Sequence, residues 1–316
     1  MQGASVLAIH GGAGGTTRSS LSAAQRAGTC ASLVRALEEG RAILARGGSA
    51  LDAVIAAVRV LEDDAAFNAG RGAVLREDGS VALDAAVMSG IDRSAGAVAN
   101  VRRVRNPVLA AERVRRLGRH VLLTGAGADA FAASEQLEMV EPEYFIVEGR
   151  AQQLASARSS GELRLDDHGA FSGGTVGAVA RDAQGHLAAA TSTGGMTNAA
   201  ACRIGDSPII GAGTWAEDAT CAVSATGAGE SFVRAAFAHE VASGMRLGGY
   251  DLEQACAHAL ATVLDLGGRG GCAAVGHDGR IALPFNTAAM PRGWVRADGP
   301  ACVALFADEE PQPFES

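Results

Sequence analysis

The chain has 316 residues, 48% of them hydrophobic, and a mean hydropathy of +0.13, so it can bury a sizeable core. Its 35 acidic side chains exceed its 27 basic ones, and the resulting net charge of −8 argues against nucleic acid or a membrane surface as a partner. All 27 basic residues are arginines. The absence of lysine excludes a lysine Schiff base, a Walker-type phosphate lysine and a serine–lysine dyad.

The first half of the chain alternates apolar strands with amphipathic helices. The expected elements, in chain order, are a strand at 5–10 that ends in a glycine cluster at 11–15, helices at 22–46 and 49–63, a hairpin around 77–79, strands at 81–88 and 97–101, and a helix opened by Pro107 with Asn106 as its cap.

A change of composition marks the middle of the chain. Residues 150–174 are rich in Ala, Ser, Arg, Gln and Asp with little apolar periodicity, which predicts a flexible linker. The elements expected after it are strands at 175–181, 186–193 and 221–225, helices from about 230 and at 251–266, and hairpin strands at 271–275, 280–284 and from 294. Strands and helices in such blocks favour an antiparallel α/β layered fold over a doubly wound parallel sheet.

The six cysteines show no C-x-x-C pair and no regular spacing, a pattern typical of small buried residues in a reducing compartment. Residues 1–10 carry no positively charged stretch ahead of their short apolar run, so no signal peptide is predicted. No window approaches the roughly 18 apolar residues of a membrane span. We therefore expect a cytoplasmic protein without membrane contact.

Several chemistries lack their motifs. There is no G-x-S-x-G or H-E-x-x-H, and the seven histidines form no metal-ligand spacing. His10, at the end of the first strand, is at least as well interpreted as a hydrogen-bonded histidine as a functional one. One feature favours a dinucleotide-binding site. A strand at 120–124 precedes G-x-G-x-x-A at 125–130, and Glu148 could end a second strand, near the spacing expected for a ribose-binding acid. The chain supplies no second mononucleotide-binding half, so we rank this function last.

Three threonines stand beside glycines at strand ends. Thr175 follows Gly173-Gly174, Thr193 precedes Gly194-Gly195, and Thr226 precedes Gly227. Taken singly, each site is explained by the preference of Thr for strands and of Gly for turns. A threonine at a chain terminus, however, carries its own base, an α-amine with a pKa of about 7.7–8.0. Attack of the Thr175 hydroxyl on the Gly174 carbonyl, followed by ester hydrolysis, would create that terminus.

The segment 174–198, GTVGAVARDAQGHLAAATSTGGMTN, resembles the plant-type asparaginases, or isoaspartyl peptidases, which are N-terminal-nucleophile hydrolases. The resemblance extends over nearly the whole chain, through IHGGAGG at 9–15, FNAGRGAVL at 67–75, LDAAVMSG at 83–90, RIGDSPIIGAG at 203–213, ATGAGESFVR at 225–234 and LPFNTAAMPRG at 283–293. It implies one αββα domain over 1–316, a precursor that cleaves itself into an α subunit (1–174) and a β subunit (175–316), and a dimer of these αβ units.

The resemblance also implies catalytic roles. Thr175 would be the nucleophile, released by cleavage behind Gly174, and Thr193 would hold its hydroxyl and amine by hydrogen bonds. The Thr226 hydroxyl and the Gly227 N–H would form the oxyanion hole, which stabilises the charge that develops in acyl transfer. Asn68 would support the nucleophile and its intermediate.

Substrate binding would fall to a second group of residues. Arg203 would pair with the substrate α-carboxylate, Asp206 would accept hydrogen bonds from the α-ammonium, and the backbone of Gly227 and Gly229 would add contacts. Opposite charges three residues apart suit a zwitterionic amino acid, although without the threonines a surface salt bridge would be the better explanation.

The family binds no catalytic cofactor but does bind a structural sodium ion. By position, its ligands would be the backbone carbonyls of Leu61, Glu62, Asp64, Phe67, Ala69 and Arg71. Residues 63–66 depart from the usual sequence of this loop. Cys202 replaces the usual glycine before the arginine, which could alter substrate preference, and Ala225 replaces the usual Cys or Ser before Thr226.

Together these features predict an enzyme that hydrolyses L-asparagine to L-aspartate and ammonia and cleaves β-aspartyl dipeptides through a β-aspartyl ester on Thr175. One alternative is a related enzyme acting on another β-aspartyl amide, such as glycosylated asparagine, which the lack of a signal peptide disfavours. Another is an unprocessed homologue that only binds amino acids.

Overall fold

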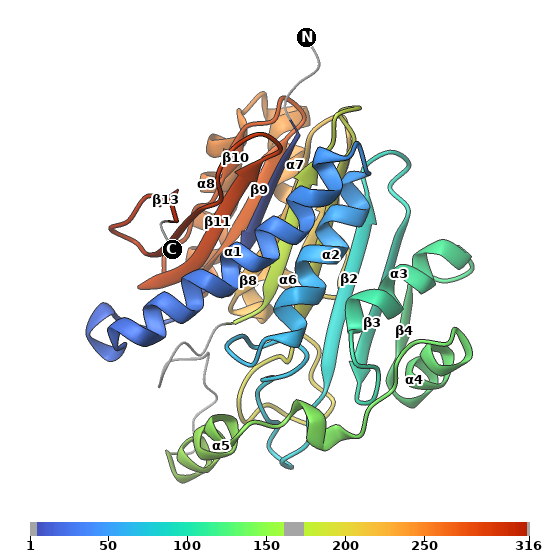
Figure 1. Cartoon of the computed structure of the whole chain (residues 1–316), viewed down its shortest axis with the longest axis vertical. Helices are drawn as coiled ribbons and strands as arrows, with labels where there is room; N and C mark the ends of the chain where they lie inside the picture. The colour runs from blue at the N-terminus through green and yellow to red at the C-terminus, as the bar shows by residue number, and fades with distance from the viewer. Residues whose placement is uncertain (1–4, 161–173, 315–316) are drawn as a thin grey trace.

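The structure is a computed structural model that describes residues 5–160 and 174–314. Two stacked β-sheets form its centre, and helices cover the outer face of each (Figure 1). The fold is therefore an αββα sandwich, as predicted.

The larger sheet has nine strands, all antiparallel to their neighbours except the last pair. Their order is β13 (Gln312–Pro313), β12 (Cys302–Phe306), β11 (Ala289–Arg296), β1 (Val6–His10), β5 (Val176–Arg181), β6 (Leu187–Thr193), β2 (Leu83–Ser89), β3 (Ala95–Val101) and β4 (Leu122–Thr124). The smaller sheet is antiparallel, in the order β10 (Ile281–Ala282), β9 (Gly270–Gly276), β8 (Cys221–Gly227) and β7 (Thr214–Ala216).

The helices divide between the two outer faces. Helices α1 (Ala23–Ala45), α2 (Ala50–Asp63) and α3 (Pro107–Leu117) pack on the larger sheet, while α6 (Gly229–Ala235), α7 (Phe237–Gly248) and α8 (Leu252–Asp265) lie against the smaller one. Helix α4 (Gly125–Ser134) packs beside β3 and β4, and α5 (Glu148–Ser160) precedes the second half of the chain. Two 3₁₀ turns, Arg18–Ser20 and Pro142–Phe145, complete the set among the described residues.

Alternating side chains of the central strands fill two separate cores. In β1, Leu7 and Ile9 face α1 and α2, whereas Val6 and Ala8 face the smaller sheet. The same alternation recurs in β5, where Ala178 joins the first core and Val179 the second. Because successive side chains of a strand point to opposite faces, a fully apolar strand is the expected sequence for a sheet buried on both sides.

The prediction of a flexible linker is wrong for residues 150–160. These residues belong to α5, and the side chains of Leu154 and Ala157 are buried. Ala, Leu, Gln and Arg are strong helix formers, so a weakly periodic sequence can still be helical where two apolar side chains find a core. Residues 161–173 of the expected linker lie outside the described part of the chain.

The structure around β4 contradicts the prediction of a dinucleotide site. A strand does lead into α4, but Glu148 begins α5 rather than ending a second strand.

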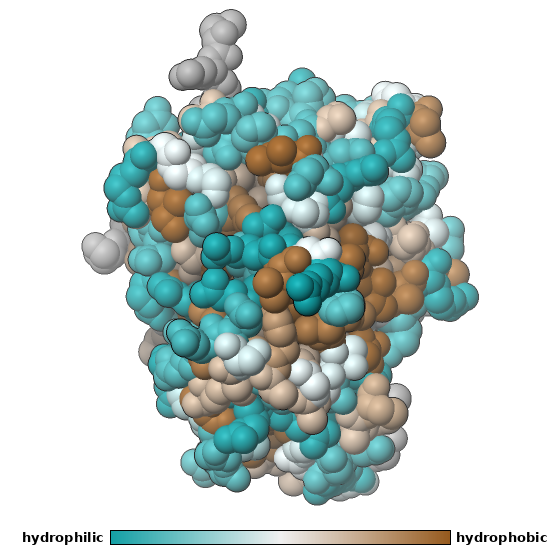
Figure 2. All heavy atoms as spheres, turned by 90° about the vertical axis from the view of Figure 1, so that its right-hand side faces the viewer, coloured by the Kyte–Doolittle hydropathy of each residue, from teal (hydrophilic) through white to brown (hydrophobic). Residues whose placement is uncertain are grey.

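Exposed apolar side chains cluster near the β4 edge of the larger sheet, with Leu117 51%, Val121 54% and Leu122 40% exposed. Figure 2, which views the molecule from this side, shows apolar patches among hydrophilic ones. No helix within the described ranges is long and apolar enough to cross a membrane.

Candidate active site

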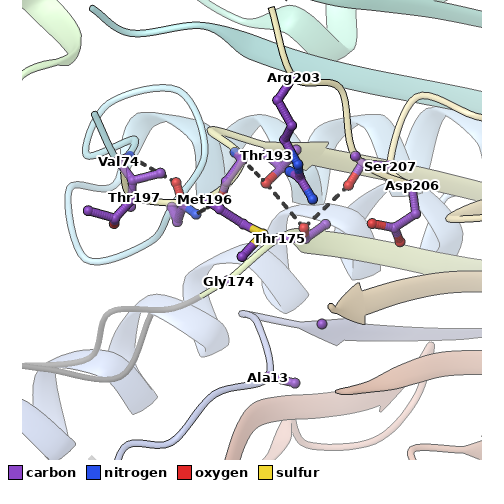
Figure 3. A pocket seen from close by; sticks show the side chains of 14 residues that line it. Ala13, Val74, Gly174, Thr175, Thr193, Met196, Thr197, Arg203, Asp206 and Ser207 are labelled. Carbon is purple, nitrogen blue, oxygen red and sulfur yellow. Dashed lines mark hydrogen bonds between the residues drawn. The ribbon is translucent and has the colours of Figure 1, made fainter. Parts of the chain in front are cut away.

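The predicted threonines meet at one end of the sandwich. Strands β5 and β6 form a hairpin in which Val176 pairs with Ser192, so Thr175 and Thr193 lie at the same end of the larger sheet. Thr226 lies near the end of β8 in the facing sheet. All three side chains are buried, and Figure 3 shows Thr175 at the centre of the pocket.

The Thr175 hydroxyl has two hydroxyl partners. Its Oγ1 donates a hydrogen bond to Thr193 Oγ1 at 3.1 Å and lies 3.3 Å from Ser207 Oγ. Thr193 Oγ1 also accepts a hydrogen bond from the Gly195 N–H at 3.0 Å. The role expected for Thr193 fits this geometry. Sequence reasoning missed Ser207, although it follows Asp206 directly and a hydroxyl beside a charged recognition residue was the available signal.

The glycine cluster brings bare backbone to the Gly174–Thr175 bond. Gly12 has a φ of +105°, and a Cβ on it would lie 2.1 Å from the Gly174 nitrogen. Thr226 Oγ1 accepts a hydrogen bond from the Ala13 N–H at 3.0 Å, and a Cβ on Gly174 would lie 3.2 Å from that oxygen. Any residue larger than glycine at position 12 would therefore displace Gly174 and the Gly174–Thr175 peptide bond, which is the bond expected to break.

Asn68 lines the pocket and is fixed through both ends of its amide. Its Nδ2 donates to the Gly195 carbonyl at 2.8 Å, and its Oδ1 accepts from the Val74 N–H at 2.9 Å. The Gly194 N–H donates to the Asn68 carbonyl at 3.0 Å. In the intact chain Asn68 thus holds the turn after Thr193 in place.

Two oppositely charged side chains, those of Arg203 and Asp206, also face the pocket around Thr175 (Figure 3). Arg203 makes a two-pronged ion pair with Glu230, with Nε–Oε1 at 2.8 Å and Nη2–Oε2 at 2.9 Å, and this pairing lowers the pKa of Glu230. Asp206 is only 3% exposed, and its Oδ2 has no hydrogen-bond partner in the described structure. Burial raises the pKa of Asp206 to about 7, against the opposing effect of Arg203.

Gly229 separates the two charged groups. A Cβ at this position would lie 2.7 Å from Arg203 Nη2 and 2.9 Å from Asp206 Oδ1. The complete pocket lining is Ala13, Asn68, Val74, Gly174, Thr175, Thr193, Gly195, Met196, Thr197, Arg203, Gly205, Asp206, Ser207 and Gly227. One pocket therefore combines the Thr175 hydroxyl, further hydroxyl groups and a pair of opposite charges.

His10 is a buried hydrogen-bonded histidine. Its Nε2 lies 2.9 Å from Ser224 Oγ, which lies 2.7 Å from Thr191 Oγ1 in the space between the sheets. Burial lowers the pKa of His10 to about 3, so the ring is neutral at physiological pH. His10 does not line the pocket.

The six residues expected at the sodium site span the last turn of α2 and the loop that follows it. The Arg71 N–H donates to the Glu62 carbonyl at 2.7 Å, and the Phe67 N–H donates to the Asp64 carbonyl at 3.2 Å. Of the two departures near the pocket, Cys202 is exposed and Ala225 is buried in the second core. None of the six cysteines forms a disulfide, and the described residues contain no cluster of three metal-binding side chains.

A threonine hydroxyl at the start of a central strand of an αββα sandwich, next to a bond enclosed by glycine backbone, is the arrangement typical of an N-terminal-nucleophile hydrolase. The family model described as asparaginase matches residues 3–304, and the chain belongs to this family.

Known relatives cover almost the entire chain. The isoaspartyl peptidase of Salmonella typhimurium is 49% identical over 309 residues, which cover 96% of this chain and 99% of that protein. The isoaspartyl peptidase of Escherichia coli is 46% identical, with coverage of 97% and 98%. The isoaspartyl peptidase/L-asparaginase of Xenopus laevis is 38% identical, with coverage of 93% of each chain.

Proposed function

We propose that this protein hydrolyses L-asparagine to L-aspartate and ammonia and cleaves β-aspartyl dipeptides, after cutting itself between Gly174 and Thr175. The observation that carries the proposal is the pocket in which the Thr175 hydroxyl faces Thr193 and Ser207, with Arg203 and Asp206 beside it. The names of the relatives, isoaspartyl peptidase and L-asparaginase, support the same substrates.

Self-cleavage begins in the intact chain. The Thr175 Oγ attacks the carbonyl carbon of Gly174, its proton passes to the departing Thr175 nitrogen, and the peptide bond becomes an ester. Water then hydrolyses the ester, which leaves a carboxylate on Gly174 and a free α-amine on Thr175. The products would be an α subunit (1–174) and a β subunit (175–316).

The mature site then acts on the side-chain amide of the substrate. The new α-amine accepts the Thr175 hydroxyl proton while Oγ attacks the amide carbon. The Thr226 hydroxyl and the Gly227 N–H stabilise the oxyanion, and Asn68 supports the nucleophile. The α-amine of Thr175 then passes the proton to the leaving nitrogen of the substrate, which departs as ammonia from asparagine or as an amino acid from a dipeptide. Water releases aspartate from the Thr175 ester.

Recognition of the substrate falls to the charged side of the pocket. Arg203 pairs with the α-carboxylate, Asp206 accepts from the α-ammonium, and the backbone of Gly227 and Gly229 lies against the bound amino acid. The small size of Gly229 leaves room between the two charges.

A Thr175→Ala variant tests self-cleavage. Because no lysine is present, the intact chain has one primary amine, at its N-terminus, and cleavage adds a second on Thr175. Denaturing mass spectrometry after amine labelling should show two singly labelled fragments in the wild type and one singly labelled chain in the variant. Thr262→Ala, on α8 away from the pocket, should cleave normally. A wild type that stays intact after long incubation would disprove self-processing.

The substrate class needs a separate measurement. Free aspartate released from asparagine and from β-Asp-Leu should rise with fully cleaved protein. If neither substrate is hydrolysed, glycosylasparagine becomes the substrate to test. A chain that remains intact and only binds amino acids would support the unprocessed homologue.

We further propose a structural sodium ion held by backbone carbonyls of the last turn of α2 and of the loop that follows it. The hydrogen bonds from the Arg71 and Phe67 N–H groups leave a second lone pair on the Glu62 and Asp64 carbonyls. A Cβ on Gly70 would lie 2.4 Å from the Glu62 oxygen, so a glycine there lets this segment fold tightly. The ion would stabilise this loop and take no part in the reaction.

Assembly and location are also part of the proposal. The exposed apolar residues Leu117, Val121 and Leu122 form the kind of surface that a dimer of αβ units would bury. The absence of disulfides among the six cysteines supports a cytoplasmic location.

A further inference from the structure

Arg76 is a fully buried arginine close to the pocket. No carboxylate lies within ion-pair distance of it among the residues that the structure describes. Its guanidinium donates instead to three backbone carbonyls, those of Arg203 at 2.5 Å, Ala200 at 3.3 Å and Ala82 at 3.4 Å. Burying an arginine in this way is costly, so its contacts call for an explanation.

Two of these carbonyls belong to the turn that presents Arg203. The Arg203 N–H donates to the Ala200 carbonyl at 2.9 Å, which closes the turn, and Arg76 Nη1 bridges the Ala200 and Arg203 carbonyls. A planar guanidinium with donors in a fixed fork can hold two acceptors in one arrangement, which an ammonium or an amide holds less rigidly. Arg76 therefore fixes the backbone from which the Arg203 side chain starts.

The backbone around Arg76 is itself held by hydrogen bonds. The Arg76 N–H donates to the Ser80 carbonyl at 2.9 Å, which closes a turn. On either side, the Asn198 N–H donates to the Leu75 carbonyl at 3.0 Å, and the Glu77 N–H donates to the Ala199 carbonyl at 2.9 Å. The segment around Arg76 is thus tied directly to the segment that leads into the Arg203 turn.

The far end of Arg203 is held separately, by Glu230 through Nε and Nη2. With Glu230 on that edge, the Nη1 group remains for a substrate carboxylate, provided that the Arg203 backbone stays where Arg76 holds it. A Cβ on Gly195 would lie 3.5 Å from Arg76 Nη2 and 3.7 Å from Arg203 Nη1, so the two guanidinium groups approach the same pocket-lining glycine.

We propose that Arg76 is a positioning residue that sets the specificity of the pocket for substrates with a free α-carboxylate. It acts through the Ala200 and Arg203 carbonyls and does not touch the substrate. The inference rests on the proposed function, in which Arg203 binds that carboxylate.

The test compares L-asparagine with its α-amide, which lacks the carboxylate. The preference is the ratio of kcat/KM for the two substrates. Arg76→Met, which removes all donors, should lower this preference by about tenfold or more, the effect of losing one charge-assisted hydrogen bond. The loss should appear as a higher KM for asparagine, with kcat for the α-amide close to that of the wild type. Arg76→Gln, which keeps one amide donor, serves if the Met variant does not fold.

Arg292 provides a matched control. It is also a buried arginine whose guanidinium donates only to backbone carbonyls in the described structure, those of Met290, Phe306 and Glu309, and it does not line the pocket. Arg292→Met should reduce stability but leave the preference between the two substrates unchanged. A purely structural role for Arg76 would give the same result as this control.

The outcomes separate the inference from the proposed function. A wild type without preference for asparagine over its α-amide, or an Arg203→Met variant that keeps the preference, would disprove the role of Arg203. If both behave as proposed but folded Arg76→Met or Arg76→Gln protein keeps the wild-type preference, Arg76 is not a positioning residue. Loss of preference in a folded Arg76 variant supports the inference.

Discussion

Burial of Asp206 decides the pH at which the proposed substrate site carries its full charge. The side chain is 3% exposed and its pKa is raised to about 7, so near neutral pH a substantial fraction of the protein carries a protonated Asp206. A protonated carboxyl group pairs poorly with the α-ammonium of a substrate. The charge of Asp206, and with it the proposed binding, increases as the pH rises through its pKa.

The KM for asparagine should therefore fall as the pH rises from about 6 to about 8. The α-amine of Thr175 titrates in a similar range, about 7.7–8.0, but it acts in the chemical step and so affects kcat. Steady-state kinetics of cleaved wild-type and Asp206→Asn protein should separate the two groups. The variant should show a higher KM that no longer varies with pH, and a KM that still falls with pH would contradict the role of Asp206.

Helix ends show how local sequence fixes single elements. Helix α8 begins with a capping box, in which Asp251 Oδ1 accepts from the Gln254 N–H at 2.9 Å and Gln254 Oε1 accepts from the Asp251 N–H at 3.1 Å. Such a cap satisfies two backbone donors that the helix itself leaves unpaired. Helix α3 differs, because the predicted cap Asn106 has no capping side-chain bond and its Nδ2 donates to Asp63 instead.

Asp251→Ala should lower the free energy of unfolding by about 1 kcal/mol, the usual value of a lost cap. Because α8 lies on the outside of the smaller sheet, self-cleavage and kcat should not change. Urea unfolding monitored by circular dichroism measures the loss, and Asp251→Asn, which keeps an acceptor, should lose much less. Equal losses in the two variants would contradict a capping contribution.

At the scale of the whole molecule, the two fragments that the proposed self-cleavage would produce share one sheet. Strand β1, which precedes the proposed cleavage site, pairs with β5 and β11, which both follow that site. Strand β2 likewise precedes the proposed cleavage site and pairs with β6, which follows it. Backbone hydrogen bonds and both cores therefore join the described residues before Thr175 to those after it.

The two fragments should consequently stay together after cleavage. They should co-elute in gel filtration without denaturant and separate only when the protein unfolds. Denaturing electrophoresis of the eluted peak measures this directly. Fragments that separate under native conditions would contradict the continuous nine-stranded sheet.

Much of the fold could be predicted from the sequence because its signals are local. Helices α1 and α2 begin directly after Ser22 and Ser49, within one residue of the expected starts, and the apolar runs of β1, β5 and β6 are strands. Helix α5 could not be predicted, since its stability depends on two side chains, Leu154 and Ala157, finding a core formed by distant parts of the chain.

The sequence by itself determined which chemistry was possible: a lysine-free chain, three threonines beside glycines, and an arginine three residues from an aspartate. Only the tertiary structure decided how these groups act together. Strand register brings Thr193 to the Thr175 hydroxyl, the turn after β6 adds Ser207, and burial raises the pKa of Asp206. The role inferred for Arg76 also depends on contacts across more than a hundred residues, because distances and burial arise only when distant segments pack together.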